Sequence, residues 1–441
     1  MPTDPSGPEA DLERDFAEAR EHHMAGRLRQ AGELYQRILS VDPNHADALH
    51  LAGVLLLQGR HFTPAIETIS RAIEVNPEVA KYHSNLGNAL RDCGRQDEAV
   101  AAYRRALEIE PEFVEAHHNL GTALADVGQV EDGIASLEAA LKIDPDFVPS
   151  LGNLAGLLQE QERLDEAIAI SKRALDLDPG RTEVRTNLAV ILLKKGDGQG
   201  ALDICESCLA AGQQKVRALA LKAIALAELG EGDAAKALLD LDGLIRADPV
   251  RAPAPYDDLA TFNQALAEHV ASHPSLVRSP PGHAQPSGWR TGELSGDEAT
   301  PIGALKTLLT EAVAAWIDAV PPDDSQAFWA ARPTDYSLKI CGIATDRQNL
   351  QRPRVRPGAW LGGLYHAAVP PVADDPAAEE AGWIEFGRAY DGFYKKSEPM
   401  TRSIEPAEGV LVTFPSYFWH QTIPFRSIQP RITIAFDVVP S

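Results

Sequence analysis

Two arginines separated by one residue are the most chemically distinctive feature of the C-terminal part of the chain. Arg354 and Arg356 lie in the run from Asn349 to Pro370, NLQRPRVRPGAWLGGLYHAAVP. Because side chains alternate along a strand, both guanidinium groups are expected to face the same side. With Arg431 nearby, three such groups would suit an anion, such as a dicarboxylate, a phosphate or an acidic side chain. A surface ion pair with Asp or Glu of this acidic chain is the alternative.

The elements that would position these arginines are short strands. From Ala327 onward, runs of alternating or continuous apolar residues are punctuated by Pro and Gly, a pattern typical of strands joined by turns. Many short strands of this kind predict a sandwich or a barrel. The candidate strands are 337–344, 359–369, 382–386, 409–414, 420–423 and 431–438.

Three sequence blocks in this region resemble the core of a family of Fe(II)/2-oxoglutarate oxygenases that often follow tetratricopeptide repeats. The blocks are Gly-Trp-Ile-Glu-Phe-Gly at 382–387, Phe-Pro-Ser-Tyr-Phe-Trp-His at 414–420, and Arg-Ile-Thr-Ile-Ala-Phe at 431–436. The resemblance covers 325–440 well and 250–325 more loosely. It implies an all-β double-stranded β-helix, which is a jelly-roll, with buttressing helices.

The resemblance also assigns roles to individual residues. His420 matches the last histidine of the iron-binding triad, and Arg431 matches the basic residue that pairs with the distal carboxylate of 2-oxoglutarate. Tyr365 matches a family tyrosine that is expected to face the same pocket, which places its neighbour His366 on the opposite side of the sheet. The other two iron ligands should come from the positions of Arg354 and Arg356. A guanidinium group has no lone pair to donate and stays charged in proteins, so the metal site looks degenerate.

Two interpretations of the C-terminal region follow from this conflict, and the sequence leaves open whether the protein is an enzyme. In the first, the domain is a pseudo-oxygenase that serves a binding or scaffolding role. In the second, it is an active dioxygenase that uses Fe(II) and 2-oxoglutarate to hydroxylate a protein side chain, with His420 as a metal ligand. A purely structural cap on the repeats is a third possibility.

The N-terminal half carries a 34-residue repeat. A small residue lies twelve positions before the proline of each repeat, and leucines recur at helical spacing within the repeats. This pattern predicts pairs of closely packed helices. The period and these marks resemble the tetratricopeptide repeat, in about seven copies over 12–249. The repeated prolines are Pro43, Pro77, Pro111, Pro145 and Pro179.

Asparagines recur with the same period on the first helix of successive repeats. Each immediately precedes a leucine of the apolar stripe, so it lies about 100° around the helix from that leucine. Repeats of this kind stack into a superhelix whose first helices line a groove, where an Asn amide can pair with the backbone of an extended peptide. Hydrogen bonding between neighbouring helices is the alternative role. The four residues are Asn85, Asn119, Asn153 and Asn187.

Composition limits the remaining function classes. The 441 residues include 64 acidic and 41 basic side chains, for a net charge of −23, which disfavours nucleic acid as a partner. No apolar run approaches the roughly 20 residues of a membrane helix, and the first residues lack the features of a secretory signal. Four cysteines do not make a disulfide framework, so we expect a cytoplasmic protein.

The predicted organisation is therefore multidomain, with an all-α repeat superhelix followed by an all-β domain. The expected segments are a disordered tail over 1–11, the repeat array over 12–249, a linker with supporting helices over 250–324, and the oxygenase-like domain over 325–441. The expected partners are a protein or extended peptide in the repeat groove and a small anion in the β domain.

Overall fold

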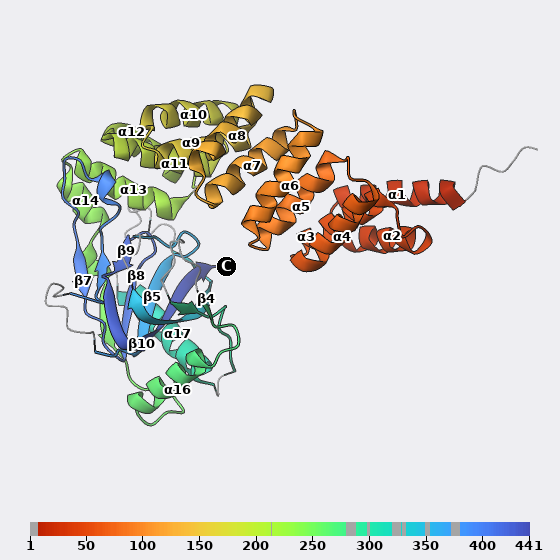
Figure 1. Cartoon of the computed structure of the whole chain (residues 1–441). Coiled ribbons are helices and arrows are strands. Elements are labelled where there is room, and N and C mark those ends of the chain that lie inside the picture. Colours follow the sequence, from red (N-terminus) through yellow and green to blue (C-terminus); the bar gives the residue numbers. More distant parts are fainter. Residues whose placement is uncertain are drawn as a thin grey trace, which may run out of the picture. The chain divides into compact units, whose positions relative to one another are not determined.

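A computed structural model of the chain forms two compact units, Met1–Gly180 and Arg181–Ser441 (Figure 1). Each unit is described by itself below. The structure describes residues 8–212, 214–278, 288–297, 300–319, 328, 332–348, 353–371 and 380–441.

The first unit consists of helices that pack as successive antiparallel hairpins (Figure 1). From α3 to α9, the first helix of each hairpin recurs with the predicted 34-residue period, which confirms the tetratricopeptide-repeat architecture. Helix α1 already begins at Pro8, before the expected start of the array at residue 12. The helices are α1 (Pro8–Met24), α2 (Leu28–Val41), α3 (Ala46–Gln58), α4 (Phe62–Val75), α5 (Ala80–Asp92), α6 (Gln96–Ile109), α7 (Val114–Asp126), α8 (Val130–Ile143), α9 (Val148–Glu160) and α10 (Leu164–Leu177).

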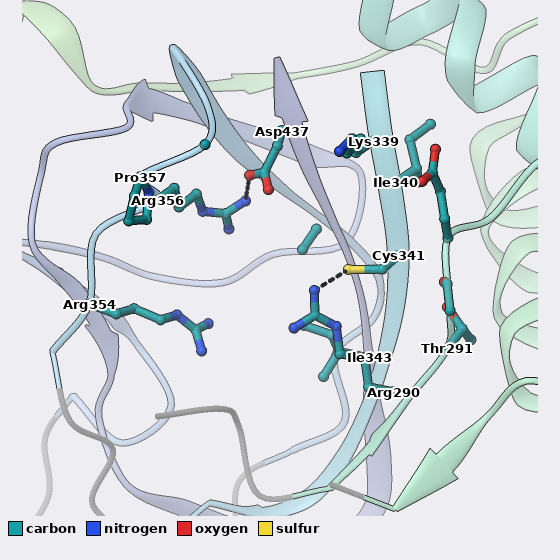
Figure 2. A pocket seen from close by; sticks show the side chains of 14 residues that line it. Arg290, Thr291, Lys339, Ile340, Cys341, Ile343, Arg354, Arg356, Pro357 and Asp437 are labelled. Carbon is teal, nitrogen blue, oxygen red and sulfur yellow. Dashed lines mark hydrogen bonds and ion pairs between the residues drawn. The ribbon is translucent and has the colours of Figure 1, made fainter. Parts of the chain in front are cut away.

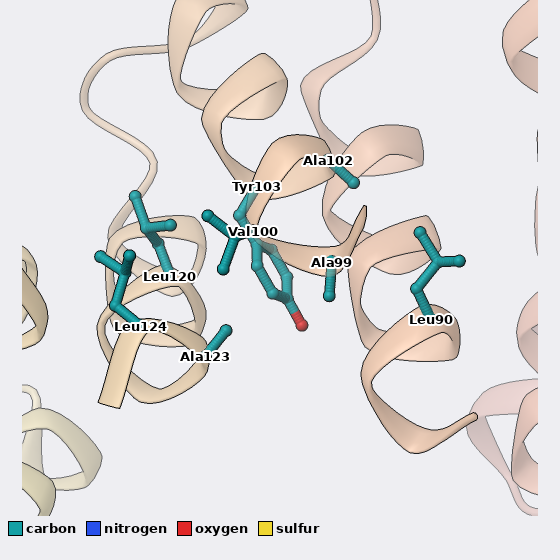
Figure 3. Close-up of a cluster of buried hydrophobic side chains, with 8 residues drawn as sticks. All are labelled: Leu90, Ala99, Val100, Ala102, Tyr103, Leu120, Ala123 and Leu124. Atoms are coloured by element: carbon teal, nitrogen blue, oxygen red, sulfur yellow. The ribbon is translucent and has the colours of Figure 1, made fainter. Parts of the chain in front are cut away.

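Small residues allow the two helices of a hairpin to approach closely. A Cβ atom added to Gly87 would lie 2.6 Å from Cε1 of Tyr103, so only glycine leaves room for this ring. Ala99, the small residue at the crossing, is fully buried beside Tyr103. Figure 3 shows the resulting cluster between α5, α6 and α7, in which Leu90, Leu120 and neighbouring side chains enclose the tyrosine. The periodic small residues are thus explained by packing.

The second unit begins with the remaining repeat helices and adds two helices that support the sheet. Helix α13 is buried along most of its length, unlike the half-exposed helices of an open array. The helices are α11 (Thr182–Lys195), α12 (Gly198–Ala210), α13 (Lys215–Glu228), α14 (Gly232–Leu238), α15 (Leu241–Leu244), α16 (Leu259–Ala271) and α17 (Pro301–Ala319). The last two match the supporting helices expected within 250–324.

The repeat helices of the second unit are attached to its strands and loops by hydrogen bonds. Nε1 of Trp419 donates to the carbonyl of Ala220 at 3.4 Å, and the Tyr417 hydroxyl donates to the carbonyl of Leu238 at 2.6 Å. The carboxylate of Glu228, at the end of α13, accepts hydrogen bonds of 3.0 to 3.2 Å from the amides of 395–397. These contacts explain why the compact unit includes helices that the sequence analysis assigned to the array over 12–249.

The described strands form two antiparallel sheets. Their orders are β1-β8-β5-β10-β4-β3-β2 and β7-β6-β9. From β4 onward the chain passes back and forth between the two sheets, which is compatible with the predicted jelly-roll. The strands are β1 (Arg246–Pro249), β2 (Val277–Arg278), β3 (Trp289–Arg290), β4 (Tyr336–Gln348), β5 (Leu361–Ala368), β6 (Ile384–Phe386), β7 (Arg402–Ile404), β8 (Val410–Pro415), β9 (His420–Thr422) and β10 (Phe425–Pro440).

Helix α16 packs against β4 and β5 on one face of the larger sheet. A Cβ atom on Gly342 of β4 would lie 2.6 Å from Cγ1 of Val270, so the helix lies almost on the strand backbone. The opposite face of the sheet is left to line the interior of the domain. None of the helices in the described part of the chain combines the length and the apolar character that crossing a bilayer requires.

Candidate functional site

Backbone pairing places residue 354 directly beside His420. The two residues form an isolated antiparallel bridge, in which the Arg354 amide donates to the His420 carbonyl at 3.1 Å and the His420 amide donates back at 3.0 Å. The side chains follow the backbone, and Nε of Arg354 lies 3.5 Å from Nε2 of His420. The structure therefore brings together these two residues that the sequence placed at one site.

The imidazole of His420 is buried and neutral. Its Nδ1 lies 3.1 Å from the carbonyl of Phe418, which can only accept, so Nδ1 carries the proton and Nε2 carries the lone pair. Burial, and then the charges of Arg356 and Arg354, lower the pKa of His420 well below its usual value. The lone pair that a metal ion would use faces the Nε–H of Arg354 instead, in a long and therefore weak hydrogen bond.

Arg356 forms its hydrogen bonds with partners other than His420. Its NH1 forms an ion pair with Asp437 and donates to the carbonyl of Phe436 at 2.8 Å. Its guanidinium carbon lies 5.3 Å from the ring centre of Phe414. Of the two side chains, 11% of Arg356 and 37% of Asp437 is exposed, so the ion pair that the sequence offered as an alternative exists and is half-buried.

Arg431 and His420 line the same small chamber inside the domain, with a volume of about 40 Å³. NH1 of Arg431 donates to the carbonyl of Gly382 at 2.7 Å, and its guanidinium carbon lies 4.1 Å from the ring centre of Phe425. Its Nε and NH2 are buried without a hydrogen-bond partner among the described residues. Burial lowers the pKa of Arg431 to about 10, so the group stays charged at neutral pH.

The structure corrects the expected positions of Tyr365 and His366. Tyr365 faces α16, where its hydroxyl donates to Asn263 and its ring packs 6.1 Å from that of Phe262. His366 instead lines the chamber with His420. Strand alternation separates the two neighbours as expected, but in the opposite phase to the one that the resemblance implied. His366 Nδ1 lies 3.1 Å from the Thr433 hydroxyl, and burial followed by Arg431 lowers the pKa of His366 to about 3.

No complete set of metal ligands surrounds His420 among the described residues. Within the described part of the chain, no three His, Cys, Asp or Glu side chains gather as metal ligands would. The carboxylate of Glu385 is already engaged, because it accepts hydrogen bonds from Gln421 at 2.6 Å and Arg388 at 2.9 Å. The side chain of Asp346 lies outside the described residues. A facial triad needs two further donors beside His420, and the group next to it is a cation.

A second, larger hollow of about 440 Å³ lies on the other side of Arg354, and we call it the outer basin (Figure 2). Arg354 and Arg356 reach in from one wall and Arg290 from the opposite wall. Burial, followed by the charges of Arg356 and Arg290, lowers the pKa of Arg354 to about 10. The other residues that line the outer basin are Thr291, Gly292, Glu293, Lys339, Ile340, Cys341, Ile343, Pro357, Gly358, Ala435 and Asp437.

Two lining residues of these cavities, Arg290 and Lys339, were not predicted from the sequence, and a third, His366, was placed on the wrong side of the sheet. Arg290 and Lys339 precede the family motifs, so no spacing pointed to them. His366 is the sequence neighbour of Tyr365. Knowing which side chains of β5 face the interior would have identified His366 as a lining residue of the chamber.

Three of the repeated asparagines bond to a neighbouring helix, and Asn119 is half-buried. Asn85 Nδ2 lies 2.7 Å from Nε2 of His50 on α3, and Asn153 donates to the Thr122 hydroxyl on α7 at 3.0 Å. In the second unit, Asn187 accepts from an Arg217 NH2 group on α13 at 2.9 Å. The inter-helix role that was offered as the alternative is therefore present at these positions.

Comparison with protein-family models agrees with this architecture. Residues 343–437 match the family described as "Putative 2OG-Fe(II) oxygenase". Tetratricopeptide-repeat models match residues 22–88, 87–128, 126–189, 158–214 and 216–240. The chain carries tetratricopeptide repeats and a 2OG-Fe(II) oxygenase-family domain. The comparison with curated proteins found no match.

Several solved structures are similar to part of the chain. PilW, described as a type IV pilus biogenesis factor, is 22% identical, and the match covers 46% of this chain and 94% of PilW with a TM-score of 0.44. PilF of Pseudomonas aeruginosa is 23% identical over 45% of this chain and 89% of PilF, with a TM-score of 0.40. YrrB, described as a repeat protein with an unusual peptide-binding site, is 20% identical over 40% of this chain and 91% of YrrB, with a TM-score of 0.34.

Proposed function

We propose that this protein is a peptide-binding repeat protein whose oxygenase-family domain works without iron, as a scaffold or pseudo-oxygenase. The observation that carries the proposal is the position of Arg354, whose Nε–H lies against the Nε2 lone pair of His420. A metal ion bound by His420 would have to displace this cation and would still face a second one at Arg356. Both effects oppose Fe(II) electrostatically.

The repeats supply the protein-binding part of the proposal. Repeat superhelices present a groove lined by their first helices, which is suited to an extended chain. Asn85, Asn119 and Asn153 recur on these helices of the first unit, and Asn187 holds the equivalent position in the second. A side-chain amide offers two donors and an acceptor, so an Asn already bonded to a neighbouring helix keeps capacity for a peptide backbone.

The cavities supply the second part, which is the binding of an anion in the β domain. Arg354 and Arg356 line the outer basin, and Arg431 lines the inner chamber. The buried Nε and NH2 of Arg431 have no hydrogen-bond partner among the described residues, so both can donate to an anion in the chamber. Tyr365 is not one of the proposed anion-binding residues, because it faces α16.

An active Fe(II)/2-oxoglutarate dioxygenase is the second candidate, and the position of His366 favours it. His366 and His420 line one chamber with Arg431, so two imidazoles and a carboxylate-binding guanidinium occur together. In that case Arg354 would have to move aside. The substrate would be a protein side chain presented by the repeats.

Metal content and turnover separate the two candidates. The purified protein is loaded anaerobically with Fe(II), desalted and assayed for bound iron and for succinate formation from 2-oxoglutarate. We expect neither stoichiometric iron nor turnover in the natural protein, and we expect Arg354→His to raise iron binding, because it exchanges the competing cation for a donor beside His420. Turnover that is abolished by His420→Ala and by His366→Ala would overturn the proposal in favour of the enzyme.

A further inference from the structure

The outer basin concentrates positive charge in a strongly acidic protein. Four cationic side chains line it, Arg290, Lys339, Arg354 and Arg356, against two carboxylates, Glu293 and Asp437. In a chain of net charge −23, such a local excess of cations runs against the average composition. Like charges that face a common hollow repel one another, and a bound anion would relieve this repulsion.

The charges of the basin differ in how far they are already compensated. Asp437 is bound to Arg356, so this pair is largely neutralised. The Arg290 guanidinium has only a weak acceptor among the described residues, the thiol of Cys341, at 3.3 Å. Arg290 and the exposed Lys339 are therefore the cations with the most capacity left for a ligand.

The shape of the basin indicates how a ligand would enter. Lys339, Pro357 and Gly358 are exposed, so this side of the hollow is open to solvent. Deeper in, Ile343 and Ala435 offer apolar surface between the charged groups. A ligand with a short aliphatic stem and a charged end fits a hollow that has apolar surface between charged groups.

We propose that the outer basin binds carboxylates, held chiefly by Arg290 and Lys339 with Arg354 behind them. Asp437 shows that a carboxylate is compatible with this surrounding, because one already lies there in contact with Arg356. The planar fork of a guanidinium matches a carboxylate in two hydrogen bonds, and the apolar walls suit carbon stems better than a fully hydrated phosphate. The carboxylates can belong to acidic side chains of a protein or to a free dicarboxylate. Only the first source rests on the proposed function, since it requires a partner delivered by the repeats.

Direct binding measurements test the assignment. The full chain is titrated calorimetrically, in the presence of a metal chelator, with a short Glu-rich peptide, with glutarate and with inorganic phosphate. We expect carboxylate binding that weakens with added salt, from the peptide, from glutarate or from both, and the two arms identify the source. Binding of phosphate without binding of either carboxylate ligand would overturn the proposal.

Charge variants locate the bound ligand in the basin. Arg290→Gln should weaken carboxylate binding by about tenfold, the usual effect of losing one charge-assisted contact. Glu293→Gln should strengthen it, because this substitution removes a negative charge from the rim. Arg278→Gln is the matched control, since Arg278 is an exposed arginine on the adjacent strand β2 and does not line the basin.

The variants also distinguish this inference from the proposed function. If carboxylate binding is unaffected by both Arg290→Gln and Glu293→Gln, the assignment to the basin is wrong, whatever the iron content of the protein. If iron and turnover are found but Arg290→Gln still weakens binding, the basin is retained and the iron-free function fails. Thermal melting of each variant confirms that it is folded before binding is compared.

Discussion

Position 354 shows how one side chain can determine what a neighbouring histidine does. The bridge between the backbones of Arg354 and His420 sets their separation, independently of which side chain is present at 354. With an imidazole or carboxylate at 354, two donors would face one point. With arginine, the lone pair of His420 is met by an N–H group and a permanent positive charge.

His50 is a second residue whose chemistry depends on burial. It lies on α3, stacked on Tyr82 with ring centres 4.5 Å apart, and its Nε2 lies 2.7 Å from the amide nitrogen of Asn85. That nitrogen can only donate, so Nε2 must be an unprotonated acceptor. Burial, followed by the charge of Lys81, lowers the pKa of His50 from 6.5 to about 4.

This shift predicts an acid-sensitive first unit. The unfolded chain takes up a proton at His50 below about pH 6.5, whereas the folded chain resists until about pH 4. The contribution is therefore fully present above pH 6.5 and is lost as the pH falls from 6.5 to 4, up to about 3 kcal/mol. Denaturant unfolding at a series of pH values should show this loss, and His50→Phe, which keeps a ring against Tyr82, should flatten it. The exposed His61→Gln is the control, and an equal effect of both variants would contradict the assignment.

The sequence predicted residue chemistry better than residue orientation. The exclusion of Arg354 as a metal ligand followed from the chemistry of guanidinium alone. Which of Tyr365 and His366 enters the chamber depends on which face of β5 meets α16, and that is a tertiary fact. Arg290 could not be predicted as a site residue for a related reason. Its strand β3 pairs with β4, which is distant in the sequence.

At the scale of elements, the repeat helices illustrate a trade between helix propensity and close packing. Glycine inside a helix costs stability relative to alanine unless a neighbour needs the space. Gly87 on α5 has such a neighbour in Tyr103, whereas Gly156 on α9 has no atom within 4 Å of an added Cβ. The two positions lie in the same class of helix and differ only in what faces them.

We therefore expect the same substitution, glycine to alanine, to have opposite effects on stability at Gly87 and Gly156. Gly87→Ala should destabilise the first unit by about 1–3 kcal/mol, because the methyl group overlaps the Tyr103 ring. Gly156→Ala should stabilise it by about 0.5–1 kcal/mol through the unfolded chain and helix propensity. Chemical denaturation of both variants, measured side by side, checks the signs. Two changes of the same sign would mean that packing at Gly87 is not limiting.

Helices were easier to predict than strands for a physical reason. A 34-residue period repeats the same local packing problem several times, so the marks reinforce one another. Strands have no such repetition, and short edge strands such as β1 and β7 carry too few residues for a pattern to appear. The central strands β5, β8 and β10 were predicted because they are apolar, although β10 extends well beyond the expected 431–438.

At the scale of the molecule, the second unit depends on one buried carboxylate at the end of α13. Glu228 is 4% exposed and accepts from the amides of residues 395–397 and from the Ser397 hydroxyl at 2.6 Å. Burial alone would raise the pKa of Glu228, but these hydrogen bonds outweigh it and lower the pKa below the usual 4.5. A charged acceptor with several donors is therefore the stable arrangement.

Glu228→Gln should loosen the attachment of α13 to the loop. The amide retains one acceptor oxygen and turns an NH₂ group toward donors, so we expect a loss of roughly 2 kcal/mol in the unfolding of the second unit. The contribution of the natural carboxylate should be full above pH 4.5 and should be lost as the pH falls through its lowered pKa. The exposed Glu231→Gln is the control for a lost charge near α14. Hydrogen exchange at residues 395–397 reports the loosening directly, and protection equal to that of the natural chain would contradict it.

The apolar surface of α13 also constrains how proteins of this architecture can be recombined. Ala220, Leu221 and Ile224 are buried in the same unit as the two sheets, and Nε1 of Trp419 donates a hydrogen bond to the backbone of that helix. A crossover at the proline-rich stretch 249–255 would join a foreign helix to a new β domain and leave both surfaces mismatched. Exchanges near residue 180 keep the helix with its own β domain, so chimera design should favour that point.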